Sequence, residues 1–141
     1  MKKLIIILLA AVVAVSAGFS AFAQDNPSAA KMTAYYFHGS VRCITCTNME
    51  KYSREAIETN FQDTIASGKL EFKAVNVEEG GNEHFVDDYQ LYTKALILSL
   101  VKDGKEIKSK NLDQIWQLSR DKEKFFEYVT GEINEFMKDA P

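Results

Sequence analysis

A pair of cysteines, with two residues between them, follows directly on a predicted strand. Residues Lys31 to His38 (KMTAYYFH) are rich in aromatic side chains and end at Gly39-Ser40, a pattern typical of a buried strand and a turn. Cys43 and Cys46 come next, and a helical pattern begins at the first of them. The fold must therefore present both sulfur atoms where a strand gives way to a helix.

The segment behind the cysteines predicts a long amphipathic helix. From Cys43 to Ile65, apolar residues recur at helical spacing with charged residues between them, which indicates one face packed on a core. Gly68 then supplies a stop signal. The apolar stripe consists of Met49, Tyr52, Ala56, Ile57, Phe61 and Ile65.

Three further strands are predicted downstream. Leu70 to Val77 is the first of them, and a Gly-rich turn leads into a short helical stretch through Tyr89. Ala95 to Lys102 is the most apolar run outside the N-terminal segment, and Asp103-Gly104 joins it to Lys105 to Lys108 as a hairpin. The helical crossover implies parallel pairing of the first two strands, and the hairpin implies an antiparallel edge.

A last amphipathic helix completes the predicted elements. Asp121 can cap it, and its apolar stripe consists of Phe125, Val129, Ile133, Phe136 and Met137. We therefore expect an α/β fold with a central mixed four-stranded sheet flanked by helices. The order of these elements, with the cysteine pair between the first strand and the first helix, resembles the thioredoxin fold over residues 31–141.

The N-terminus has the three-part layout of a secretory signal peptide. Met1-Lys2-Lys3 is a short basic start, Leu4 to Val15 is apolar, and Ala21-Phe22-Ala23 is a small-x-small cleavage site. A permanent membrane anchor over Leu4 to Ala23 is the alternative, because that stretch is about long enough to span a bilayer. We expect export, with a periplasmic protein after cleavage behind Ala23.

The mature chain is predicted to be one acidic domain. Cleavage would leave 141 − 23 = 118 residues, with a signal peptide over 1–23, a flexible leader over 24–30 and a domain over 31–141. Loss of Lys2 and Lys3 lowers the basic count from 17 to 15 against 20 acidic residues, so the net charge is near −5. That charge disfavours a nucleic-acid partner, and we expect a monomer.

The spacing of the cysteines favours redox switching over a structural role, because a disulfide across so short a loop stabilises a fold little. Exchange needs a thiolate, and the predicted helix start would direct free amide groups at the sulfur of Cys43. Arg42 adds a positive charge, and His38 adds another if it lies close and is protonated. We predict that Cys43 is the exposed nucleophile and that Cys46, buried one turn further in, resolves the mixed disulfide. Whether the pair acts as reductant or oxidant stays open.

Four short stretches suggest a narrower family. They are Tyr35 to Gly39 (YYFHG), Arg42 to Cys46 (RCITC), Met49-Glu50 and Ile115-Trp116. Together they resemble a bacterial thioredoxin-like family known as nitrophenyl compound nitroreductase subunit ArsF. The resemblance implies a small exported redox protein whose cysteine pair receives electrons from a membrane thiol-disulfide carrier.

A complete nitroreductase is not expected. Reduction of a nitro group takes several electrons and normally a flavin or a metal, and the sequence has no GxGxxG fingerprint. A dithiol supplies one electron pair in each cycle. We therefore expect a thiol-disulfide oxidoreductase without a cofactor, which relays electrons to a few protein or small-molecule targets.

The chain departs from ordinary thioredoxins at the loop that faces the cysteines. Those proteins place a cis proline just before the third strand, whereas Pro27 and the C-terminal residue are the only prolines here. Leu96 aligns with that position, and the predicted groove loop is Lys94, Ala95 and Leu96, with trans peptide bonds. Arg42 also replaces the usual tryptophan. Both departures favour a dedicated relay over general disulfide reduction.

Metal binding is the main alternative function. Cys43 and Cys46 with His38 and His84 would make a Cys2His2 set for zinc or copper, and Met49 could add a soft ligand for Cu(I). A chaperone-like protein that uses the two cysteines with His38 belongs to the same alternative. A purely structural or interaction module with inert cysteines is the remaining possibility.

Overall fold

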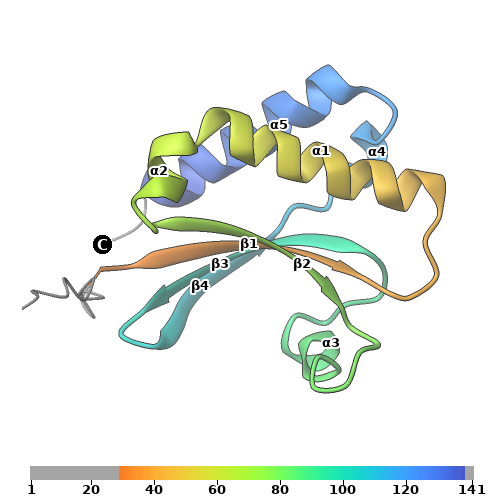
Figure 1. Cartoon of the computed structure of the whole chain (residues 1–141), viewed down its shortest axis with the longest axis horizontal. Helices are drawn as coiled ribbons and strands as arrows, with labels where there is room; N and C mark the ends of the chain where they lie inside the picture. The colour runs from red at the N-terminus through yellow and green to blue at the C-terminus, as the bar shows by residue number, and fades with distance from the viewer. Residues whose placement is uncertain (1–28, 139–141) are drawn as a thin grey trace, which may run out of the picture.

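The computed structural model describes residues 29–138, so the predicted signal peptide and most of the predicted leader lie outside the described residues. The elements are β1 (Lys31–His38), α1 (Ile44–Asn60), α2 (Gln62–Ala66), β2 (Leu70–Asn76), α3 (His84–Asp88), β3 (Ala95–Lys102), β4 (Lys105–Asn111), α4 (Ile115–Leu118) and α5 (Lys122–Lys138). Figure 1 shows α1 and α5 over one face of the sheet and α3 against one end of the other face. Within this range no helix combines the length and the apolar character that a membrane span requires.

The four strands form one mixed sheet in the order β2-β1-β3-β4. β1 pairs with β2 in parallel and with β3 antiparallel, and β4 pairs with β3 antiparallel. In this register Tyr36 on β1 lies between Ala74 on β2 and Leu96 on β3. The predicted α/β fold with a mixed four-stranded sheet is confirmed, and the order of its elements is thioredoxin-like.

The main core lies between the sheet and the two long helices. Met49 and Ile57 of α1 and Val129 and Ile133 of α5 are fully buried, as both apolar stripes predict. Their burial removes apolar surface from water, which is the dominant favourable contribution to folding. A smaller apolar cluster lies on the other face, under α3, and consists of Phe37, Ala95 and Ile97 with the rings of Tyr35, Phe85 and Tyr89 packed against it.

Two turns depend on residues that tolerate a left-handed backbone. Asp103 and Gly104 have φ angles of 52° and 75°, so the predicted hairpin turn between β3 and β4 has positive φ at both central positions. Gly68 has a φ angle of 73° just behind α2, which confirms the predicted stop.

The predicted helix to Ile65 is broken at Phe61. The backbone of Phe61 leaves the helical region with φ −128° and ψ 32°, α1 ends there, and α2 follows. Phe61 is 5% exposed, and Ile65 packs against the same core. Apolar residues at helical spacing continue across the break, so periodicity alone could not reveal it. The sequence pattern also missed α4, a single turn that buries Ile115.

Candidate redox site

Cys43 and Cys46 form a disulfide at the N-terminus of α1, and the sequence contains no other cysteine. Cys43 is the N-cap residue with an extended backbone, and its Sγ accepts a hydrogen bond of 3.1 Å from the N–H of Cys46. The Cys43 carbonyl accepts from the N–H and the hydroxyl of Thr47 at 3.0 and 3.1 Å. The sulfur therefore lies where a helix leaves its first N–H groups without helical partners.

The two sulfur-bearing residues differ in exposure. Cys43 is exposed, whereas Cys46 is 2% exposed and faces the core. These values agree with the predicted exposure of Cys43 and burial of Cys46. The exposed sulfur is the one that a second molecule could reach.

A hydrogen bond joins Tyr36 to the main chain of Cys46. Its hydroxyl, on β1, donates a buried hydrogen bond of 2.7 Å to the main-chain carbonyl of Cys46. Burial raises the pKa of Tyr36 well above its ordinary value; the nearby charge of Arg42 lowers it and that of Glu50 raises it. The hydroxyl thus stays a neutral donor that joins the sheet to the first turn of α1.

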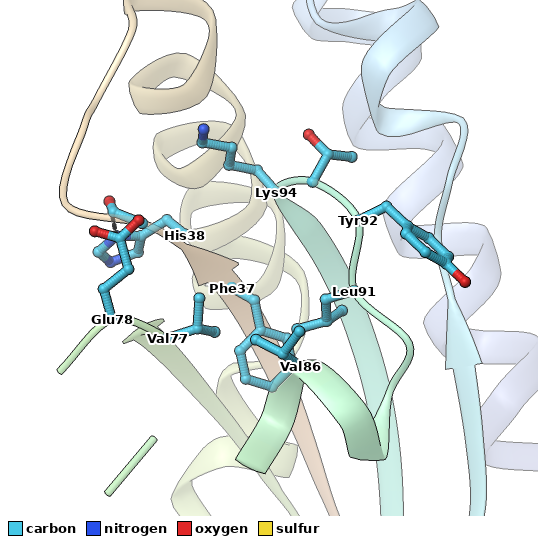
Figure 2. A pocket seen from close by; sticks show the side chains of 10 residues that line it. Phe37, His38, Val77, Glu78, Val86, Leu91, Tyr92 and Lys94 are labelled. Carbon is cyan, nitrogen blue, oxygen red and sulfur yellow. Dashed lines mark hydrogen bonds between the residues drawn. The ribbon is translucent and has the colours of Figure 1, made fainter. Parts of the chain in front are cut away.

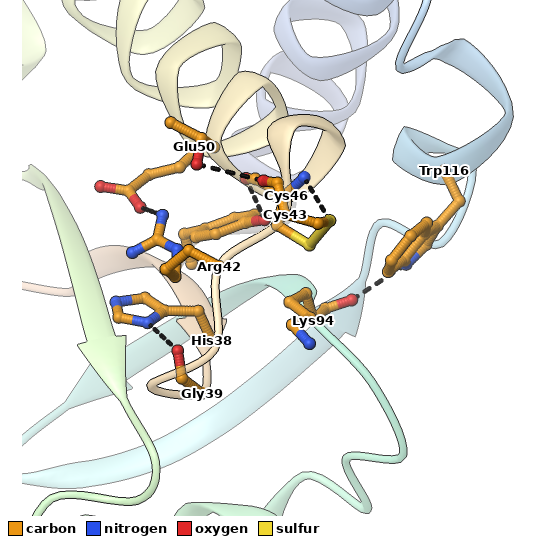
Figure 3. Close-up of a disulfide and its surroundings, with 10 residues drawn as sticks. His38, Gly39, Arg42, Cys43, Cys46, Glu50, Lys94 and Trp116 are labelled. Carbon is orange, nitrogen blue, oxygen red and sulfur yellow. Dashed lines mark hydrogen bonds and ion pairs between the residues drawn. A yellow bond between two sulfur atoms is a disulfide. The ribbon is translucent and has the colours of Figure 1, made fainter.

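Arg42 does not stand beside Cys43 as a free positive charge. Its guanidinium forms an ion pair with Glu50, which lies one helical turn beyond Cys46 (Figure 3). Glu50 also approaches Arg54 at 3.6 Å. The Glu50 side chain is 18% exposed, so part of this pair is shielded from water. The sequence pattern includes Glu50 in the Met49-Glu50 stretch but does not predict this ion pair, because Arg42 lies before the helix and the two residues have no helical spacing.

His38 ends β1, half-buried, with Nδ1 3.0 Å from the carbonyl oxygen of Gly39. Its ring centroid is 6.4 Å from that of Tyr36. The structure therefore places His38 under the cysteine-bearing loop, with its imidazole turned to the main chain of that loop.

Glu78 anchors the same loop and was also missed. One of its carboxylate oxygens accepts a hydrogen bond of 2.9 Å from the N–H of Ser40, and this bond lowers the pKa of Glu78. A Cβ on Gly39 would lie 2.5 Å from the other oxygen, so the close approach depends on glycine. Asn76 donates a further bond of 3.1 Å to the Ser40 hydroxyl. Ser40 and these two partners are almost forty residues apart in the sequence, so no local pattern could predict the contacts.

The predicted groove loop is only partly correct. Lys94 is half-buried and lies in the surroundings of the disulfide, where its carbonyl accepts a hydrogen bond of 2.9 Å from the indole N–H of Trp116 (Figure 3). Ala95 and Leu96 instead begin β3 at 6% and 0% exposure, so Leu96 is a core residue. All peptide bonds among residues 29–138 are trans.

Two pockets flank the loop that contains Lys94. Figure 2 shows the larger, of about 180 Å³, with His38, Glu78 and Lys94 around an apolar floor that includes Phe37. The smaller, of about 100 Å³, lies on the other side and is lined in part by Trp116. His38 and Lys94 belong both to the larger pocket and to the surroundings of the disulfide.

Exposed apolar side chains occur close to Cys43 in the sequence. Val41 and Ile44, on either side of Arg42-Cys43, are 81% and 83% exposed. Tyr92, predicted to belong to the core or a groove wall, is 95% exposed in the loop before Lys94. Apolar surface of this kind is typical of contacts with other molecules.

The four residues of the alternative metal site do not come together. His84 lies on α3, where its Nδ1 is 2.7 Å from Asp88, and Met49 is fully buried in the core. Across residues 29–138 no group of three or more His, Cys, Asp or Glu side chains could hold a metal ion.

Comparison with known proteins gives only distant likenesses. A thioredoxin from Fasciola hepatica has a TM-score of 0.45 and 16% identity, over 82% of this chain and 85% of that chain. Thioredoxin O2 from Arabidopsis thaliana in the oxidized state has a TM-score of 0.41 and 16% identity, over 68% of this chain and 76% of that chain. No family model and no curated protein matches the sequence. The thioredoxin-like description of this chain therefore rests on its own strand order and on its cysteine pair at the start of α1.

Proposed function

We propose that the protein is a thiol-disulfide redox protein that works through Cys43 and Cys46. One observation carries the proposal: a disulfide joins an exposed cysteine to a buried one at the N-terminus of the helix that follows β1. An exposed sulfur can meet a partner, and a buried neighbour can release that partner.

The proposed cycle conserves atoms and electrons. A donor thiolate attacks Sγ of Cys43 and expels the Cys46 thiolate. A second donor thiolate then attacks the donor sulfur of the mixed disulfide, which releases the Cys43 thiolate and leaves the donor as a disulfide, so two electrons enter. The Cys43 thiolate next attacks a target disulfide and expels one target thiolate. The Cys46 thiolate attacks Sγ of Cys43, which restores the intramolecular disulfide and releases the second target thiolate.

The helix N-terminus supports the attacking role of Cys43. The N–H of Cys46 already points at the Cys43 sulfur at 3.1 Å. Amide groups so placed, together with the positive end of the helix dipole, favour a thiolate over a thiol. Cys46 is buried, so we propose that it reacts only with the sulfur of Cys43.

The partner is proposed to be a protein. Val41 and Ile44 present apolar surface on both sides of Cys43, and Trp116 adds a partly exposed indole. Exposed aliphatic and aromatic side chains around a reactive sulfur fit contact with another polypeptide better than with a small charged molecule.

A finer proposal concerns the place of the cycle in the cell. The N-terminal sequence supports export to the periplasm, and the resemblance of four short stretches to the ArsF family supports a membrane thiol-disulfide carrier as donor. Arg42 stands where general thioredoxins have a tryptophan, and no proline lies in the loop directly before β3; both departures support a dedicated relay with few targets.

A redox titration tests the central proposal. The purified protein is equilibrated in glutathione buffers of graded poise, free thiols are trapped by alkylation, and the alkylated species are counted by mass. We expect one reversible two-electron transition, which disappears in Cys43→Ser. Bound metal at one equivalent with no such transition would overturn the proposal.

Trapping in cells tests the partner and the compartment. Cys46→Ala cannot resolve mixed disulfides, so it should accumulate complexes that reducing agent dissolves. Cys43→Ser/Cys46→Ala is the matched control and should form none. Complexes with a membrane protein, recovered from the periplasmic side, are expected. Complexes with cytoplasmic proteins alone would contradict export and the relay.

A further inference from the structure

We propose that Glu50 is a positioning residue that sets the redox poise of the cysteine pair by engaging the charge of Arg42. The inference rests on the proposed function and deepens it, because it gives a physical reason for the reducing direction of the proposed cycle. It predicts that the cysteine pair acts as a reductant.

The ion pair between Arg42 and Glu50 lies beside the cysteine-bearing turn. Arg42 is the residue before Cys43, Glu50 lies one turn beyond Cys46 on α1, and both charges act on Tyr36, whose hydroxyl binds the carbonyl of Cys46. The two side chains are 30% and 18% exposed. Such partial burial keeps the pair from being screened as fully as an exposed one.

Glu50 also fixes the loop that leads to Cys43. Glu78 holds the start of this loop through the N–H of Ser40, and Glu50 holds its end through Arg42. The loop is thus anchored to the end of β2 and to the second turn of α1. The ion pair orients the side chain of Arg42 toward Glu50 on α1.

The charge of Arg42 determines whether the cysteine pair is expected to be reducing or oxidising. A free guanidinium next to Cys43 would stabilise its thiolate and so the reduced form, which makes a pair more oxidising. With Glu50 beside it, the guanidinium adds little net charge at the sulfur. The reduced form is then less stable, and the dithiol gives up its electrons more readily.

The other groups around the pair do not replace Glu50. Arg54 approaches Glu50 from the same helix at 3.6 Å, and Tyr36 from β1 is a neutral donor to Cys46. His38 faces the Gly39 carbonyl, and Lys94 lies in the loop before β3. Among them, only Arg54 shares the carboxylate of Glu50 with Arg42.

A double-mutant cycle tests the inference in the full chain. Glu50→Gln, Arg42→Gln and the double variant are compared with wild type by glutathione equilibrium and by the pH at which Cys43 becomes reactive to alkylation. Glu58→Gln is the matched control, because Glu58 is a carboxylate of the same helix that pairs with Arg54 at 3.8 Å. Urea unfolding of each oxidised variant checks the fold.

With Arg42 present, Glu50→Gln should shift the equilibrium with glutathione about three- to tenfold toward the dithiol and lower the pH of Cys43 ionisation by about half a unit to one unit. In the Arg42→Gln background, the same change should have a clearly smaller effect, because only the direct influence of the carboxylate is left. Glu58→Gln should behave as wild type.

Equal effects of Glu50→Gln in both backgrounds, or no effect in either, would overturn the inference. Both results leave the proposed function standing if the wild type shows its reversible transition. Absence of that transition in the wild type would overturn the proposed function itself, before any variant is compared.

Discussion

The hydroxyl of Tyr36 donates a hydrogen bond of 2.7 Å to the carbonyl oxygen of Cys46, inside the interface between β1 and α1. Tyr36 is fully buried and belongs to the main core. The bond couples the central strand of the sheet to the residue that holds the buried sulfur. The position of Cys46 is therefore set by the sheet as well as by the helix.

Tyr36→Phe should lower the free energy of unfolding of the oxidised protein by about 1 kcal/mol, because one buried hydrogen bond is lost while the ring is kept. Urea unfolding followed by circular dichroism measures the change. Tyr52→Phe is the control, since the contact of that ring with Phe125, at 5.6 Å between centroids, does not use the hydroxyl. Equal losses in both variants would show that the Tyr36 hydrogen bond is not the cause.

Much of the fold could be predicted because its signals are local. The bounds of β1 and β3 agree with prediction to the residue, since aromatic and aliphatic runs between turn residues mark buried strands. Asp103-Gly104 identified the hairpin for the same reason. The break at Phe61 could not be predicted, because apolar spacing continues through it.

The site was less predictable than the fold. The exposure of Cys43 and the burial of Cys46 follow from helical spacing, so their positions agree with expectation. The contacts of Ser40 with Glu78 and of Arg42 with Glu50 join segments that meet only after folding. Charges of this kind resemble any solvated surface charge in the sequence, and only the three-dimensional arrangement distinguishes them.

Two glycines should respond to alanine with opposite signs. Gly104→Ala should destabilise the protein by about 1 kcal/mol, because its φ of 75° is costly for a residue with a Cβ. Gly131→Ala lies inside α5, where a Cβ meets nothing within 4 Å, and should stabilise by about 0.5 to 1 kcal/mol. Thermal unfolding of both variants checks the prediction, and a change of the same sign in both would contradict it.

Glu78 should contribute to stability only where it is ionised. The hydrogen bond from the Ser40 N–H holds its pKa below the ordinary value of 4.5. A carboxyl with a lowered pKa stabilises the fold above its unfolded value, and the contribution is lost as the pH falls through the folded value. Wild type should therefore lose more stability than Glu78→Gln when urea unfolding is repeated from about pH 5 downward. Parallel curves would contradict this prediction.

Tyr89 should produce the opposite dependence at high pH. Burial, then its hydrogen bond to the carboxylate of Glu106, raises the pKa of Tyr89 from 10.0 to about 12. An acid with a raised pKa favours folding while it is protonated, so its contribution is complete below 10 and is lost between 10 and 12. Tyr89→Phe should flatten this alkaline loss in urea unfolding, and an unchanged profile would contradict the assignment.

Trp116 should report the redox state of the disulfide. It is the single tryptophan of the chain, and its indole lies in the surroundings of Cys43 and Cys46, fixed by its hydrogen bond to the Lys94 carbonyl (Figure 3). A disulfide at short range quenches an excited indole by electron transfer, so emission should rise when dithiothreitol reduces the bond. Cys43→Ser/Cys46→Ser should show no response to the reductant. The midpoint of the emission change in glutathione buffers should equal the midpoint obtained by thiol trapping, and emission that stays constant through reduction would place the indole beyond quenching range.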